Sequence, residues 1–188
     1  TTAGLMHHFP TKQELLVALA DHRISLLAGW ATESQEEDDG LGFWRTTIRL
    51  TERMVSKPGL IGLFLVVAFE AADPTSPVHE LYARRYEEGV RRGAGHWRAG
   101  IARGLFRPDI DCEAFARQSI AVTDGLQLQW ALSGGALDLV GAIKDHHERL
   151  VSSAALPGVV VDLTPAGRRR SAARDRATPT PDRPDQLP

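Results

Sequence analysis

The chain has 188 residues, of which 43% are hydrophobic, and its formal net charge is −2. This length suits one core of ordinary size with a fragment of a second domain. The small net charge excludes binding to nucleic acid through overall charge alone. The charge is uneven, because Pro157–Pro188 contains six Arg and four Asp, a net of +2, which leaves −4 for the remainder. Any contact with DNA must therefore come from a small local surface.

The single cysteine, Cys112, excludes an intramolecular disulfide and fits a reducing compartment. Two carboxylates flank it, so we expect an inert, at least partly buried thiol. The longest apolar run, Leu60 to Ala72, is interrupted by Glu70 and is shorter than the ~20 residues of a membrane span. With no secretory signal at the start, we expect a cytoplasmic protein without a membrane partner.

The first predicted elements are a short helix, a sharp turn and a long helix. The turn lies at Phe9-Pro10, and Thr11 with Glu14 forms a capping box for the helix that follows. Apolar residues recur at helical spacing from Leu15 to Trp30, which predicts a helix ending near Gly29 or Ala31.

An acidic segment, 33–40, separates this helix from the next and is expected to be a solvated loop. A cation site is the alternative, but the segment lacks the glycine-turned loop with alternating ligands that such a site needs. A second helix is predicted over 41–56, and it is broken by Lys57-Pro58-Gly59.

The next two helices differ in character. Residues 60–72 are apolar on nearly every side, which predicts a buried central helix. After the break at 73–77, an amphipathic helix is predicted over 78–103, with Arg and Glu side chains paired at three- and four-residue spacing on its polar face.

The last elements are two helices and a tail. A turn at 104–111 ends in Asp111, a good N-cap for a helix over 112–132, and Ser133-Gly134-Gly135 separates that helix from one over 136–155. Residues 157–188 are rich in Pro and Arg, and we expect disorder there, certainly from about Thr164 onward. The fold class predicted is therefore all-α, a helical bundle.

Four stretches of the chain resemble the tetracycline-repressor-type (TetR-type) transcriptional regulators, and together they cover residues 1 to about 155. Asp124-Gly125-Leu126-Gln127-Leu128-Gln129-Trp130 is the most specific wording among them. The four are the opening segment 1–12, the stretch 100–111, the stretch 121–130, and the final helix pair with its glycine turn.

The resemblance implies that the opening segment is the end of a DNA-reading helix, followed by the start of the next helix. Ala3 and Met6 depart from the glycine and tyrosine usual in the family, so one phosphate contact is in doubt. His8 would pack toward the helix junction. A simple structural turn anchored by Phe9 is the plainer alternative. The residues implied to contact DNA are Thr1, Thr2, Ala3, Gly4, His7 and Lys12.

The central helices are expected to enclose an apolar effector cavity, because large aromatic side chains with a few hydroxyls and an amide suit such a cavity. An ordinary solid core is the alternative. No obvious fixed charge for an anionic ligand is apparent, so we expect a hydrophobic or aromatic, weakly polar effector. The predicted lining is Trp44, Thr47, Thr51, Met54, Phe64, Val67, Trp97, Ile101, Phe115, Gln118 and Val122.

The last two helices are expected to form a dimer interface, in which two helices from each subunit build a four-helix bundle. An intramolecular core is again the alternative. His146 and His147 are adjacent, so they do not form a helical metal-binding pair. The predicted interface is Ala121, Gly125, Leu128, Trp130, Leu132, Val140, Ile143, His147, Leu150 and Val151.

These expectations define three segments: a remnant of the helix-turn-helix recognition helix at 1–10, a ligand-binding and dimerisation domain at 11–156, and the tail at 157–188. The favoured function is a homodimeric transcriptional regulator, a repressor by preference, which a small hydrophobic effector releases from operator DNA. It would bind that operator only with N-terminal helices that precede Thr1. The alternative is a ligand-binding dimerisation module with no DNA binding of its own.

An enzyme is not expected. The sequence shows no paired acidic motif on a helix, no His-x-x-x-His pair and no nucleophile with a nearby base. No metal and no cofactor are predicted.

Overall fold

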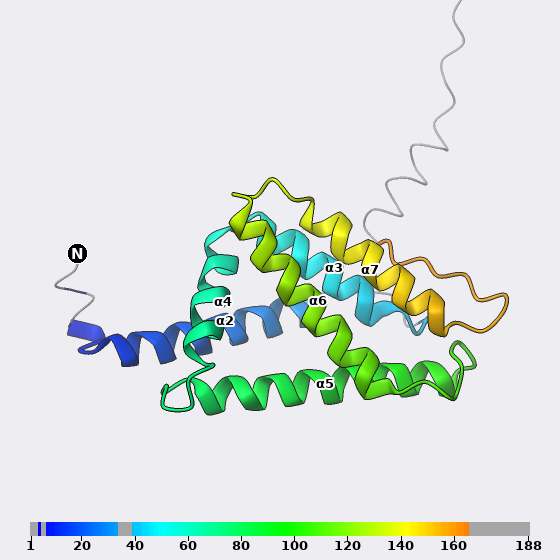
Figure 1. The fold of residues 1–188 in the computed structure, drawn as a ribbon, viewed down its shortest axis with the longest axis horizontal. Coiled ribbons are helices and arrows are strands. Elements are labelled where there is room, and N and C mark those ends of the chain that lie inside the picture. Colours follow the sequence, from blue (N-terminus) through cyan, green and yellow to red (C-terminus); the bar gives the residue numbers. More distant parts are fainter. Residues whose placement is uncertain (1–3, 5–6, 34–38, 166–188) are drawn as a thin grey trace, which may run out of the picture.

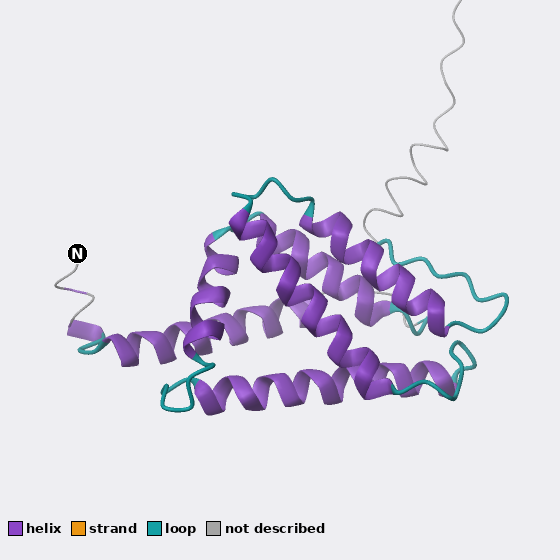
Figure 2. Ribbon diagram, in the orientation of Figure 1, coloured by secondary structure: helices purple, strands orange, loops and turns teal. Residues whose placement is uncertain are grey.

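The computed structural model describes residue 4 and residues 7–33 and 39–165 of the chain. Within these ranges the chain is helical and contains no strand, which confirms the predicted all-α class (Figure 2). No helix among the described residues is long and apolar enough to cross a membrane. The helices are α2 (Lys12–Glu33), α3 (Gly42–Val55), α4 (Gly59–Glu70), α5 (His79–Ala102), α6 (Cys112–Leu132) and α7 (Leu139–Ala154).

Three of the helices, α2, α6 and α7, begin where a side chain caps them. The capping box at the start of α2 forms as predicted, with Glu14 N donating to Thr11 Oγ1 at 3.1 Å and Thr11 N donating to Glu14 Oε2 at 3.3 Å. Asp111 caps α6 by accepting from the backbone of Glu113 and Ala114. The last helix begins later than expected, because Asp138 accepts from Gly141 N and so becomes its N-cap.

The helices form a bundle in which α6 crosses diagonally between its neighbours (Figure 1). Helix α6 packs against both α5 and α7, and α7 lies beside α3. Helix α4 stands across α2 rather than at the centre of the molecule. The predicted burial of this helix on every side is wrong, since Val66 is 56% exposed and Phe69 is 64% exposed.

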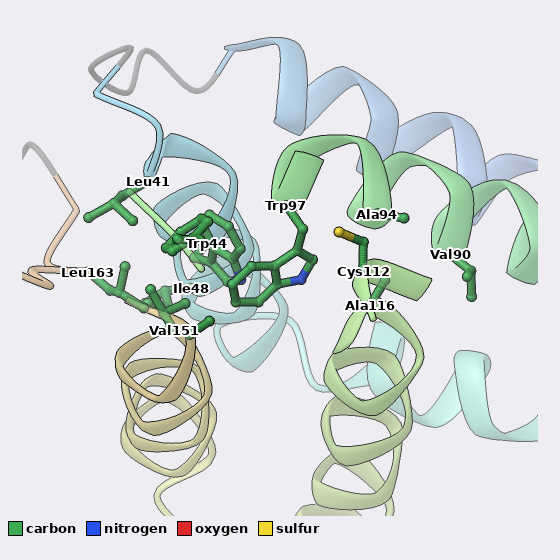
Figure 3. Packing of buried hydrophobic residues seen from close by; sticks show 12 residues of the cluster. Leu41, Trp44, Ile48, Val90, Ala94, Trp97, Cys112, Ala116, Val151 and Leu163 are labelled. Carbon is green, nitrogen blue, oxygen red and sulfur yellow. The ribbon is translucent and has the colours of Figure 1, made fainter. Parts of the chain in front are cut away.

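One cluster of buried residues, built around aromatic rings, joins α3, α5, α6 and α7 (Figure 3). Trp44 of α3 lies 4.7 Å from Trp97 of α5, measured between ring centroids, and Phe106 lies 4.8 Å from Trp97. Such edge-to-face and tilted contacts stabilise aromatic clusters beyond their buried area. Cys112 is buried at the edge of this cluster, as expected.

The turn after α5 brings Phe106 into the cluster. Gly104 adopts a positive φ of 72° that a residue with a Cβ rarely adopts, and Leu105 N donates to Gly100 O at 2.9 Å to close the helix end. The turn is then held by the end of α7, with Arg107 N donating to Ala154 O at 2.9 Å.

An ion pair between buried Arg45 and exposed Asp39 fixes both the start of α3 and the segment after α7. Arg45 is 1% exposed, and its guanidinium donates to both carboxylate oxygens of Asp39 at 2.7 and 2.6 Å and to the carbonyl of Asp162. Leu163 is fully buried. Residues 157–165, assigned above to the tail, therefore pack against the bundle, and the rest of the predicted tail lies outside the described residues.

Two glycines of α5 provide a matched test of the aromatic cluster. A Cβ added at Gly100 would overlap the Phe106 ring, whereas one added at Gly95 meets no other atom within 4 Å. We expect Gly100→Ala to lower the free energy of unfolding by about 1–3 kcal/mol through overpacking. Gly95→Ala should raise it by about 0.5–1 kcal/mol, because alanine favours the helix. Urea unfolding measures both changes, and equal effects of the two substitutions would contradict this packing.

Candidate functional site

A cavity of about 210 Å³ lies between α2, α3, α5, α6 and α7. Three of the predicted ligand residues line it: Thr47, Thr51 and Met54. The full lining is Arg23, Leu27, Phe43, Thr47, Leu50, Thr51, Met54, Arg85, Tyr86, Gly89, Arg92, Ser119, Ile120, Thr123, Asp124, Gln127 and His147.

The other predicted ligand residues lie elsewhere. Trp44, Trp97, Phe64 and Val67 are buried in the cores, so the alternative reading as ordinary core residues holds for them. Gln118 is exposed. Ile101 and Phe115 pack against the aromatic cluster, and Val122 is half-buried but absent from the lining.

The most unusual lining residue is Arg23, which sits on the inner face of α2 and is only 2% exposed. Its Nε donates to Leu60 O at 3.4 Å, and its guanidinium carbon lies 4.4 Å from the centroid of the Phe64 ring. Its Nη1 has no hydrogen-bond partner among the described residues. Burial, followed by the nearby charge of Arg85, lowers the pKa of Arg23 to about 10.

Four buried polar atoms without a partner, one of them on Arg23, belong to residues that line this cavity. Leaving a buried polar atom unpaired costs about 1–3 kcal/mol, so such atoms are rare in folded proteins. Water or a ligand filling the cavity would satisfy them. Within the described part of the chain, these atoms are Arg23 Nη1, Ser119 Oγ, Gln127 Oε1 and His147 Nδ1.

A carboxylate and a phenol form a second polar feature of the cavity wall. Tyr86 Oη donates to Asp124 Oδ2 at 2.6 Å, joining α5 to α6. Burial raises the pKa of Asp124, and the Tyr86 hydrogen bond and nearby Arg85 and Arg23 only partly oppose this shift. The guanidinium of Arg85 lies 5.5 Å from the ring centroids of both Tyr82 and Tyr86.

The polar lining corrects the expectation that the cavity holds no fixed charge. Arg23, Arg85, Arg92 and Asp124 all line it. The threonine hydroxyls that were expected to face a ligand instead donate to their own helix, Thr47 to Phe43 O at 3.1 Å and Thr51 to Thr47 O at 3.0 Å.

The predicted DNA-contacting residues that the structure describes lie at the surface. Gly4, His7 and Lys12 are exposed, and Lys12 Nζ forms an ion pair with Glu70 Oε1 at 2.9 Å. His8 is also exposed, so the expectation that it packs at the helix junction is wrong. Thr1, Thr2 and Ala3 lie outside the described residues.

The predicted dimer residues divide into three groups. Ile143, His147 and Val151 are buried inside the single chain, because the inner stripe of α7 faces α3 and α6. Val140 and Leu150 pack against the aromatic cluster. The remaining predicted residues keep exposed area, from the half-buried Gly125, Leu128 and Trp130 to the exposed Ala121 and Leu132, of which Leu132 is 79% exposed.

No group of three metal-ligating side chains occurs among the residues that the structure describes.

His147 generates a prediction about stability and pH. Burial, with His146 beside it, lowers the pKa of His147 to about 4, so the folded state favours the neutral ring. Its contribution is then fully present above the unfolded pKa of about 6.5 and lost as pH falls toward 4, a change of about 3 kcal/mol in the free energy of unfolding. Urea titrations at several pH values should show this fall, and His147→Leu should remove most of it. His22→Gln, a change at an exposed histidine of α2, serves as control. A fall of the same size in His147→Leu would contradict the assignment.

The comparisons with known proteins point in one direction. Residues 65–153 match the family described as BetI-type transcriptional repressor, C-terminal. The fold resembles that of TylP, a TetR regulator from Streptomyces fradiae. The native full-length structure shares 24% identity and a TM-score of 0.62, covering 95% of this chain and 82% of that chain. A second full-length TylP structure is 20% identical, with a TM-score of 0.56, and the match covers 96% of this chain and 78% of that chain. No curated protein matches this sequence. Residues 65–153 therefore resemble the C-terminal part of BetI-type repressors, and the chain shares its fold with the TylP structures.

Proposed function

We propose that this chain is the ligand-responsive and dimerising part of a DNA-binding transcriptional regulator. Of the two types of regulator, we favour a repressor over an activator. The observation that carries the proposal is the cavity, in which four unpartnered polar atoms belong to the lining. The TetR-type fold supplies the regulatory context. Ligand in the cavity would change the affinity of the protein for its operator.

Helix α2 provides the mechanical link between cavity and DNA. It begins beside exposed His7 and Lys12, and eleven residues later it places Arg23 in the cavity wall, a distance of roughly 16 Å along the helix. Backbone N–H groups and a lysine at a helix start favour phosphate. A ligand that prefers one packing of α2 over another shifts the position of this end, and it couples the two sites by that difference in affinity.

The exposed side of α6 supports dimerisation. Leu132 is 79% exposed at the end of α6, and Gly125 and Leu128 retain exposed area on the same helix. A pair of such helices from two copies would bury this area in an isologous interface.

The dimer predicts a selective effect of charge on α6. Leu132→Asp should raise the dimer dissociation constant at least about tenfold, because it places a desolvated charge in the interface. Phe69→Asp, at another exposed apolar residue, on α4, should leave dimerisation unchanged. Sedimentation equilibrium measures both. A wild-type chain that is monomeric at high concentration, or equal effects of the two substitutions, would contradict dimerisation through α6.

The regulatory function predicts sequence-specific DNA binding that responds to ligand. Selection from a random DNA pool by the complete regulator should yield a two-fold symmetric site. Compounds that raise the melting temperature of the protein should then change its affinity for that site, because a ligand specific for one state stabilises that state. Fluorescence anisotropy measures the change. Ligand binding and dimerisation without any selected sequence would replace this function with a binding module that lacks DNA activity of its own.

A further inference from the structure

The cavity carries more positive than negative charge. Arg23, Arg85 and Arg92 are lining residues, and Asp124 is the one acidic residue in the described lining. Asp124 directs Oδ2 to the Tyr86 hydroxyl at 2.6 Å. One carboxylate can offset only one of the three arginines, so the lining keeps an excess of positive charge.

Arg23 differs from the other two arginines in its burial. Arg92 is exposed at the rim, and Arg85 is half-buried beside tyrosine rings, whereas Arg23 is 2% exposed. An arginine stays protonated even when buried, so an unpaired guanidinium in the interior is destabilising. Leu60 O accepts from Nε, and Met54 Sδ lies 3.8 Å from Nη2. In the described part of the chain Nη1 has no hydrogen-bond partner of good geometry, although the Tyr82 hydroxyl, itself unpaired, lies near the guanidinium.

The rest of the cavity wall is suited to an apolar body. Leu27, Leu50, Met54 and Ile120 line the same space as Arg23. An apolar patch beside a buried guanidinium with an unpaired donor selects a molecule that has an apolar body and an anionic group.

We propose that the effector is an amphipathic organic acid whose carboxylate is bound by Arg23 Nη1 and whose apolar body fills the space beside Leu50 and Ile120. This inference rests on the proposed function, since it names the chemical class of the effector for the same cavity. A carboxylate on Nη1 satisfies the unpaired donor and neutralises the excess charge. Charge-assisted hydrogen bonds of this kind are about twice as strong as neutral ones.

Octanoate and octanamide provide a direct test, because they have the same size and differ in charge at neutral pH. Isothermal titration calorimetry on the whole chain should show octanoate binding at least about tenfold more tightly than octanamide. Arg23→Met should abolish this preference and Arg23→Lys should retain part of it. Arg84→Met, at an exposed arginine of α5 that pairs with Glu80 outside the cavity, should leave it unchanged.

Three results would overturn the inference: equal affinity for acid and amide, a preserved preference in Arg23→Met, or no binding of octanoate in the millimolar range. The wild-type comparison remains decisive if Arg23→Met does not fold. Equal affinity would contradict an anionic effector, but it would not contradict the proposal that the cavity binds an effector. The regulatory function is decided separately, by the selection of a DNA site.

Discussion

The buried guanidinium of Arg23 is the constraint on which the functional half of this molecule depends. Burying a charge is expensive unless neighbouring groups compensate for it. Here the compensation comes from three directions: a backbone carbonyl at the start of α4, the face of the Phe64 ring and the sulfur of Met54 on α3. Arg23 thereby fixes α2 against α3 and α4. Arg23 Nη1 has no partner among the residues described and belongs to a residue of the cavity lining, so a molecule bound there by this atom would contact α2.

The aromatic cluster beside the cavity is closely packed. Trp44, Trp97 and Phe106 interlock in a cluster without room for an added methyl group at Gly100. Beside it, the Arg45–Asp39 pair and the Asp162 carbonyl hold the ends of two distant segments together. A dense aromatic region next to a cavity with unpaired polar atoms is a suitable arrangement for a regulator, because ligand-dependent change is then concentrated at the cavity and in α2.

The sequence predicted the helices well and the site only in part. Apolar spacing and caps such as Thr11 and Asp111 are local signals, and the elements they predicted are present with shifts of a few residues at their ends. The cavity depends instead on which inward-facing polar residues of separate helices converge. That arrangement is tertiary, and no single helix pattern contains it.

A usable signal for those residues was nevertheless present. Arg23 follows Leu16 and Ala20 on the buried stripe of α2, and His147 lies between Ile143 and Val151 on the buried stripe of α7. A polar residue on an otherwise apolar stripe is either paired inside the protein or faces a cavity. The expectation for α4 failed for the opposite reason: its apolar composition concealed which side meets solvent, and only the packing against α2 decides that.

The central claim is that occupancy of the cavity is transmitted through Arg23 to α2, and amide hydrogen exchange tests it most directly. With octanoate at saturation, the account predicts slower exchange in the turns of α2 around Arg23 and a changed rate at its N-terminal end near Lys12. Protection confined to α5, α6 and α7, with exchange throughout α2 unaltered, would contradict it.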